Sequence, residues 1–162
     1  MIQLKDVACD LCGAFDQNKV LYRMPDLRFT RYEINYTVVE CLECGHRFLS
    51  PQPTIESSEF LYHSDYYASR GLTNPKQKKR YLKQAEYLPP AAKGKILDVG
   101  CAGGSWLKIA KSMDWECYGA DYIRSDYAEP DIDIRFGYLP EIDFPSSFFD
   151  VITAWGVMEH IH

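Results

Sequence analysis

The sequence predicts an α/β domain with a parallel sheet, preceded by a small β-rich segment built around a metal site. From residue 95 onward, short apolar runs alternate with a helical pattern, which is typical of parallel strands joined by crossover connections. Before residue 51, two C-x-x-C motifs accompany short runs in which polar and apolar residues alternate. We therefore divide the chain into a ribbon (1–50), a linker with helices (51–94) and an α/β domain (95–162).

The first fifty residues contain two predicted strands, Lys19–Arg23 and Asn35–Glu40, because their apolar residues alternate with polar ones. Beyond them, Thr54 is placed to cap a short helix that runs through Leu61.

A second helix is predicted to begin with Asn74 as its cap and Pro75 in its first turn, and to end before Pro89. Its expected apolar stripe consists of Tyr81, Leu82, Ala85 and Leu88. The basic residues on this helix are expected to form a solvated face.

The α/β part is predicted to hold four strands, at Lys95–Val99, Glu116–Ala120, Ile132–Phe136 and Phe149–Trp155. A helix is predicted at Ser105–Met113, between the first two strands.

Composition limits the classes of partner. Of the 162 residues 46% are hydrophobic, which excludes a disordered chain. The 18 basic and 23 acidic residues give a net charge of −5, so the chain as a whole does not attract nucleic acid and we expect no such partner. No stretch resembles a signal peptide or membrane span, so we expect a cytoplasmic protein with no membrane partner.

Four of the six cysteines form two C-x-x-C-G motifs. Two thiolates at this spacing can bind one tetrahedral ion, and the following glycine lets the backbone turn its N–H groups toward the sulfurs. In a chain without an export signal such pairs favour metal over disulfides, and neither pair follows the strand of a β-α-β unit as a redox site would. Four thiolates leave no open position for water, so we expect one structural Zn²⁺ held as a zinc ribbon by Cys9, Cys12, Cys41 and Cys44.

The glycine-rich turn after the first predicted strand discriminates between two cofactor classes. A dinucleotide site of the form G-x-G-x-x-G would need glycine at Ala102 and Ser105, so an NAD-dependent enzyme is disfavoured. The pattern D/E-x-G-x-G-x-G of S-adenosylmethionine sites fits at Asp98, Gly100 and Gly104, and Ala102 is its single departure.

The chemistry of that cofactor explains the residue types. Its methionine end is cationic, so the Asp98 carboxylate can offset the charge while small residues let the backbone approach. Asp121 ends the second strand, where a carboxylate can accept hydrogen bonds from both ribose hydroxyls. Tyr122 can cover one face of the adenine. The alternative is that both carboxylates are solvated loop residues.

Together these segments resemble a known family. Lys95–Leu107, Asp121 and Phe149–Ile161 resemble class I S-adenosylmethionine-dependent methyltransferases, which have a Rossmann-like sheet. Upstream, Cys41–Pro53 followed by Tyr66–Tyr67 resembles a bacterial subgroup with an N-terminal zinc ribbon.

The resemblance implies a cofactor site of several segments. Leu139 matches the loop that borders adenine, and Trp155 matches the end of strand four, which faces the sulfonium. Glu159 and His160 match a segment beside the acceptor pocket, where His160 can act as a base if the acceptor is a hydroxyl. The alternative is that this pair only fixes a helix start. The methionine-binding loop corresponds to Gly100, Cys101, Ala102, Gly103 and Gly104.

The implied activity is methyl transfer from S-adenosylmethionine to a small-molecule or sugar-like acceptor, on oxygen or carbon. The alternative from another class is a non-enzymatic zinc-ribbon interaction module with a cofactor-binding scaffold half. Asp98 and Asp121 favour the enzyme.

Residues 95–162 hold fewer strands than the complete fold they resemble. We therefore expect a partial domain, truncated after strand four and inactive by itself. Strand four is expected to lie beside strand one as an unpaired edge, with Trp155 and Val157 uncovered, and to mediate dimerisation.

Overall fold

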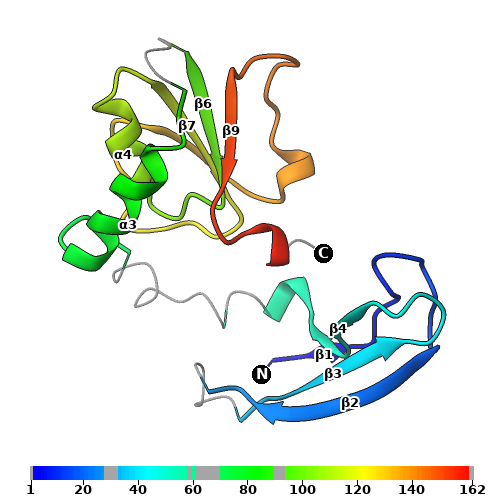
Figure 1. Ribbon diagram of the computed structural model, residues 1–162. Coiled ribbons are helices and arrows are strands. Elements are labelled where there is room, and N and C mark those ends of the chain that lie inside the picture. Colours follow the sequence, from blue (N-terminus) through cyan, green and yellow to red (C-terminus); the bar gives the residue numbers. More distant parts are fainter. Residues whose placement is uncertain (1, 28–32, 58–59, 61–69, 90–93, 161–162) are drawn as a thin grey trace. The chain divides into compact units, whose positions relative to one another are not determined.

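The computed structural model describes residues 2–27, 33–57, 60, 70–89 and 94–160 (Figure 1). The chain forms two compact units, Met1–Leu61 and Tyr62–His162. No helix within the described ranges is long and apolar enough to cross a bilayer.

The first unit is built on two small antiparallel sheets. One contains β2 (Asn18–Pro25), β3 (Asn35–Cys41) and β4 (Arg47–Leu49), with β3 in the centre. The other pairs β1 (Leu4–Lys5) with β5 (Gln52–Pro53). Both strands predicted in this region are confirmed, as parts of β2 and β3.

Strand β3 shows why this unit has only a small core. Thr37, Val39 and Cys41 alternate on its buried face, as the two-residue period of a strand requires. The buried hydrophobic residues that pack together here are Val39, Phe48, Cys9 and Cys41. Two of the four are cysteines, so the core of the unit adjoins the thiol cluster.

The segment after β5 contains a 3-10 turn, η2 (Ile55–Ser57), in which the Ser57 N–H donates to the Thr54 carbonyl at 3.0 Å. Most of the remaining predicted helix through Leu61 lies outside the described residues.

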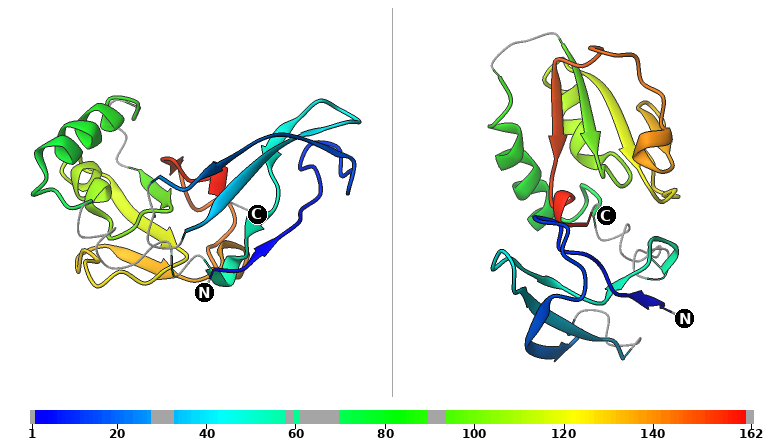
Figure 2. Two further views of the ribbon diagram at one scale, coloured as in Figure 1. Left: turned by 90° about the horizontal axis from the view of Figure 1, so that it is seen from below. Right: turned by 90° about the vertical axis from the view of Figure 1, so that its right-hand side faces the viewer.

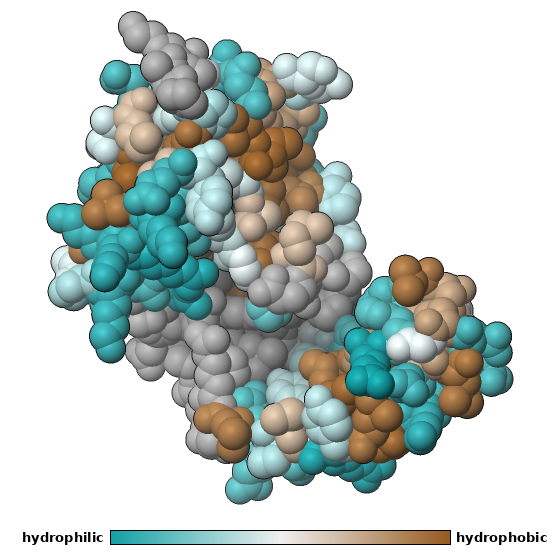
Figure 3. All heavy atoms as spheres, viewed as in Figure 1, coloured by the Kyte–Doolittle hydropathy of each residue, from teal (hydrophilic) through white to brown (hydrophobic). Residues whose placement is uncertain are grey.

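The second unit begins with α3 (Pro75–Ala85), which starts as predicted. Asn74 caps it by accepting a hydrogen bond from the Lys76 N–H at 3.1 Å. The basic side chains on this helix are exposed, and Figure 3 shows hydrophilic side chains gathered over it. They are Lys76, Lys78, Lys79, Arg80 and Lys83.

The predicted apolar stripe of α3 is wrong at one position. Ala85 and Leu88 are buried and Tyr81 packs on the core, but Leu82 is 51% exposed. Tyr81, Ala85 and Leu88 have the spacing of one helix face, whereas Leu82 is turned about 100° from Tyr81. The helix itself ends at Ala85, and Leu88 packs from the turn that follows.

A four-stranded parallel sheet forms the centre of the second unit, with the order β8-β7-β6-β9. The strands are β6 (Lys95–Val99), β7 (Glu116–Asp121), β8 (Asp133–Phe136) and β9 (Val151–Ala154), and α4 (Ser105–Lys111) connects β6 to β7. All four predicted strands and the parallel α/β class are confirmed. The predicted pairing of the fourth strand with the first is confirmed as well.

The core lies between the sheet and its helices. Ile96 of β6 and Leu107 and Ala110 of α4 are completely inaccessible to solvent. Figure 2 shows α3 and α4 together on one side of the sheet. Because β6 is an inner strand, its three middle residues are buried, and the turn that follows it is held on a rigid base.

Strand β9 is at the edge of this sheet within the described residues. Its Ile152 side chain is 63% exposed. The expectation that Trp155 is uncovered is wrong, because this half-buried indole packs against Trp106 with a ring centroid distance of 5.7 Å.

Candidate functional site

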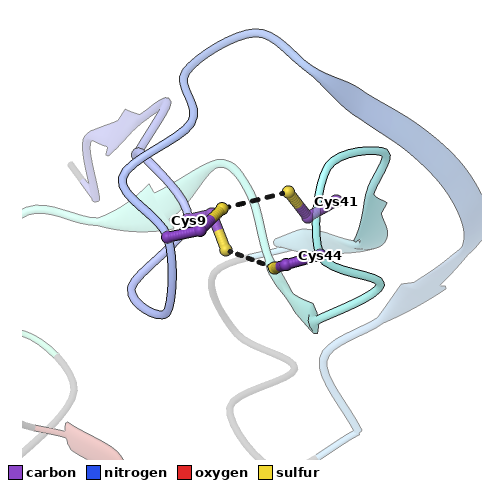
Figure 4. Close-up of side chains that lie close together, drawn as sticks. Cys9, Cys41 and Cys44 are labelled. Atoms are coloured by element: carbon purple, nitrogen blue, oxygen red, sulfur yellow. Dashed lines mark hydrogen bonds between the residues drawn. The ribbon is translucent and has the colours of Figure 1, made fainter.

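Two groups of side chains stand out, one in each unit. The first is the set of four cysteines, whose sulfur atoms all lie within 4.8 Å of one another. Figure 4 shows the thiols turned toward a common centre. The Sγ atoms of Cys9 and Cys44 are 3.6 Å apart, as are those of Cys12 and Cys41. Tetrahedral Zn–S bonds of about 2.3 Å require sulfur atoms about 3.8 Å apart, so the set can hold one metal ion.

The local backbone explains why the thiols converge. The Gly13 N–H donates to the Cys9 carbonyl at 2.7 Å, and the Gly45 N–H donates to the Cys41 carbonyl at 2.9 Å. Gly13 and Gly45 both have φ of +76°, a left-handed conformation that glycine adopts without steric cost. The two C-x-x-C-G motifs therefore form two equivalent turns that face each other.

Hydrogen bonds favour a thiolate at one cysteine of this cluster, Cys9, whereas burial and the neighbouring thiols raise the pKa of Cys12 and Cys44. Burial raises the pKa of Cys9, but the backbone N–H groups of Cys12 and Leu11 and the neighbouring thiols outweigh this effect and bring the pKa to about 7. A thiolate is the form of cysteine that binds metal.

The second group surrounds the turn between β6 and α4. Gly100, Ala102 and Gly104 have φ of +71°, +52° and +78°, so the chain reverses in a left-handed conformation. Gly104 begins α4 as its N-cap. A Cβ at Gly103 would lie 2.5 Å from the backbone oxygen of Tyr127, so this position has no room for a side chain. The turn Gly100–Gly104 is thus compact and lies at the carboxyl end of β6, and we call it the cradle.

Asp121 joins this cradle from the end of β7. Its Oδ2 accepts a hydrogen bond from the Ala102 N–H at 2.7 Å, and its Oδ1 accepts one from the Ile123 N–H at 3.1 Å. Burial raises the pKa of Asp121, although these backbone donors oppose the change. A carboxylate has about four acceptor sites, so each oxygen can accept one further hydrogen bond.

Asp98 lies in β6 just before the cradle and is 4% exposed. Its Oδ1 accepts a hydrogen bond from the Thr153 hydroxyl at 2.7 Å. Burial raises the pKa of Asp98, the Thr153 hydroxyl lowers it and Asp121 raises it, and the net result is a pKa of about 7. The site thus contains two carboxyl groups beside a turn whose N–H groups at Gly100, Cys101, Ala102 and Gly104 donate to acceptors within the protein.

Cys101 lies within the same turn and carries a thiol, and this side chain is buried. Burial raises the pKa of its thiol, and Asp121 and Asp98 raise it further, so the group is a neutral thiol that fills space. Its Sγ would lie 2.6 Å from a Cβ placed at Gly119 of β7, so a glycine there leaves room for the sulfur.

The remaining predicted residues follow the other strands. Tyr122 follows β7 and is 42% exposed, and Leu139 begins η3 (Leu139–Glu141), the 3-10 turn after β8. Trp155 follows β9. Glu159 and His160 belong to η4 (Met158–His160), where the side chain of Glu159 lies outside the described residues.

Two contacts at this site were not predicted from the sequence. The Thr153 hydroxyl reaches Asp98 across the sheet because the two residues are partners in the β6–β9 register. Val157 lies directly over Gly100. A Cβ added to Gly100 would be 2.3 Å from Cγ2 of Val157. The first contact depends on strand register and the second on the path of the chain after β9, and neither leaves a local sequence signal.

A comparison with protein families shows the family to which the chain belongs. A family model described as a methyltransferase domain matches residues 74–162, which is more than half of the chain. The chain belongs to this methyltransferase domain family. Membership supports S-adenosylmethionine-dependent methylation and the Rossmann-like reading of the parallel sheet. No curated protein matches the chain.

Proposed function

We propose that the cradle after β6 binds S-adenosylmethionine. The observation that carries this proposal is the convergence of Asp98, Asp121 and a glycine-rich left-handed turn at the carboxyl ends of two adjacent parallel strands. Open α/β sheets bind ligands at this end. The glycines fit close approach of a ligand to the backbone, and the buried carboxyl of Asp98 is suited to a cationic group.

The roles of the chain's residues follow from these positions. The loop Gly100–Gly104 would hold the methionine end, and Asp98 would offset its ammonium charge. Asp121 would accept hydrogen bonds from the ribose through its two remaining acceptor sites. Tyr122 and Leu139 would border the adenine. When bound, the cofactor supplies an electrophilic methyl group on a sulfonium.

Methyl transfer itself requires alignment of the acceptor atom more than acid-base chemistry. Trp155, which follows β9, would form part of the wall beside the reacting methyl group. His160 would accept a proton if the acceptor is a hydroxyl, with Glu159 as its neighbour. We propose a small-molecule or sugar-like acceptor, methylated on oxygen or carbon.

For the first unit we propose one structural Zn²⁺ bound by Cys9, Cys12, Cys41 and Cys44. The spacing of the sulfur atoms and the two glycine turns support it. Four protein ligands close the coordination sphere, so the ion would stabilise the fold and take no part in the reaction. A unit with four buried residues in its main hydrophobic cluster gains most from such an ion.

Calorimetric titration with S-adenosylhomocysteine tests the cofactor proposal. The Asp121→Ala change removes a charged acceptor whose bonds contribute about 1.5–3 kcal/mol each, so affinity is expected to fall by about 10- to 100-fold. Asp131→Ala, which removes an exposed aspartate between β7 and β8, is the matched control and should bind as the wild type does. Equal affinity of wild type and Asp121→Ala would contradict the assignment.

A further inference from the structure

The contact between Asp98 and Thr153 joins two strands that are far apart in the sequence. The two residues are direct partners in the parallel β6–β9 register. The Thr153 Oγ1 lies 2.7 Å from Asp98 Oδ1 and 3.4 Å from the Leu97 carbonyl oxygen. A hydroxyl has one donor hydrogen and two acceptor lone pairs, so Thr153 can serve both neighbours.

This geometry can satisfy Asp98 in both of its protonation states. When Asp98 is ionised, the Thr153 hydroxyl donates to Oδ1 in a charge-assisted hydrogen bond. When Asp98 is neutral, its O–H can donate to Thr153 Oγ1, and the hydroxyl hydrogen can turn to the Leu97 carbonyl. The charge-assisted bond is the stronger of the two, so Thr153 favours the ionised form.

The surroundings of Asp98 act in the opposite direction. Its ionisable neighbours are the Asp121 carboxyl and the Cys101 and Cys117 thiols, on β7 and in the cradle. No ion pair to a lysine or arginine reaches Asp98 in the part of the chain that the structure describes. Burial and Asp121 together raise the pKa of Asp98 to about 7 despite the Thr153 bond. Among the described residues, therefore, no cation holds this carboxylate in its charged form.

We propose that Thr153 is the positioning residue that keeps Asp98 ready to receive the ammonium group of the cofactor, and that cofactor binding drives a proton from Asp98 into solvent. This inference rests on the proposed function. The Asp98 O–H bond breaks, the proton passes to the buffer, and the carboxylate that remains pairs with the ammonium while it accepts from Thr153. Cofactor affinity should accordingly rise with pH near neutrality.

Proton release can be measured without any methyl transfer. S-adenosylhomocysteine is titrated calorimetrically into the full chain in pairs of buffers with different ionisation enthalpies. With a pKa of about 7, about half a proton should be released per molecule bound at pH 7 and nearly a whole proton at about pH 5.5, and the ligand's own amino group is protonated at both pH values. 5′-Methylthioadenosine, which lacks the amino acid end, should release none. No buffer dependence with S-adenosylhomocysteine at pH 7 would overturn the proposal.

Variants at Thr153 separate its role from simple packing. Thr153→Val keeps the shape and removes the donor, so affinity for S-adenosylhomocysteine should fall about tenfold at pH 7 and largely recover at pH 9. Thr153→Ser keeps the hydroxyl and should bind like the wild type. A loss in Thr153→Val that is equal at both pH values, or an equal loss in Thr153→Ser, would assign the residue to packing alone and overturn the proposal.

A second readout does not depend on the cofactor. Carbon-13 NMR of the Asp98 carboxyl in the free protein should give a higher pKa in Thr153→Val than in the wild type, and an unchanged pKa would overturn the proposal. The two levels of inference fail differently. If the wild type does not bind S-adenosylhomocysteine, the proposed function fails and this proposal falls with it. If the wild type binds without proton release, the proposed function survives and only this proposal is lost.

Discussion

The Asp98→Asn change is expected to remove a pH dependence from the stability of the second unit. In the folded protein burial raises the pKa of Asp98 from 3.8 to about 7, so the folded state holds a proton that the unfolded state has lost. The contribution of Asp98 to the free energy of unfolding is complete below about pH 4. It is lost progressively as the pH rises from about 4 through about 7. Asparagine keeps the shape of the side chain and an oxygen acceptor for Thr153, but it carries no proton to lose.

The magnitude follows from the difference between the two pKa values. A difference of about three, at about 1.4 kcal/mol for each pKa unit, gives about 4 kcal/mol over the whole range. About 2 kcal/mol of this falls between pH 5.5 and pH 8.5. Asp121, whose pKa burial also raises, contributes in the same direction and is retained in the variant.

Urea unfolding followed by tryptophan fluorescence is the appropriate assay, because Trp106, Trp115 and Trp155 all belong to the second unit. The wild type should lose about 2 kcal/mol more than Asp98→Asn between pH 5.5 and 8.5. The exposed control Asp131→Asn should keep the wild-type dependence. If Asp98→Asn and the wild type show the same change of stability with pH, Asp98 is ionised in the folded protein and the reasoning from burial is wrong.

Three further predictions concern the metal, the cradle and the core. The purified protein should contain about one zinc per chain, and the Cys41→Ser variant should lose it. The control Cys117→Ser changes a cysteine outside the cluster and should keep the metal. Less than half an equivalent of zinc in the wild type would contradict the site. Gly103→Ala should weaken S-adenosylhomocysteine binding at least about tenfold in calorimetry, because its Cβ would lie 2.5 Å from a backbone oxygen; unchanged affinity would show that the cradle adjusts. Leu107→Ala removes a fully buried side chain and should destabilise the second unit by about 2–5 kcal/mol in urea unfolding. Leu82→Ala changes an exposed side chain and should alter the stability by less than about 0.5 kcal/mol. Comparable effects of the two changes would contradict the burial assigned to these leucines.

The features predicted correctly from the sequence depend on short-range patterns. Alternation along Asn35–Glu40 predicts a strand because residues two apart share a face, and short apolar runs bounded by turns predict the four parallel strands. The start of α3 follows from the Asn74 cap and Pro75. The glycine pattern after β6 predicts a tight turn because left-handed backbone is accessible to glycine, although Ala102 adopts it as well.

The features that could not be predicted depend on how strands and segments meet. Leu82 is apolar and lies one residue from the buried stripe of α3, so only the tertiary contacts show that it is exposed. Thr153 becomes part of the site because the register places it beside Asp98, 55 positions earlier in the chain. The Asp121 carboxylate was expected to bind ribose, and its hydrogen bond to the Ala102 N–H adds a structural role that holds the cradle.

The central claim is that the cradle after β6 binds S-adenosylmethionine, and a nitrogen-15 NMR titration of the full chain with S-adenosylhomocysteine tests it most directly. Binding at the cradle should shift the backbone amide signals of Gly100, Ala102, Gly103 and Gly104 together, with one dissociation constant. The Asp121→Ala variant should require a higher ligand concentration for the same shifts. If these four amides do not move when the ligand is saturating, the cofactor does not bind at this turn and the account is wrong.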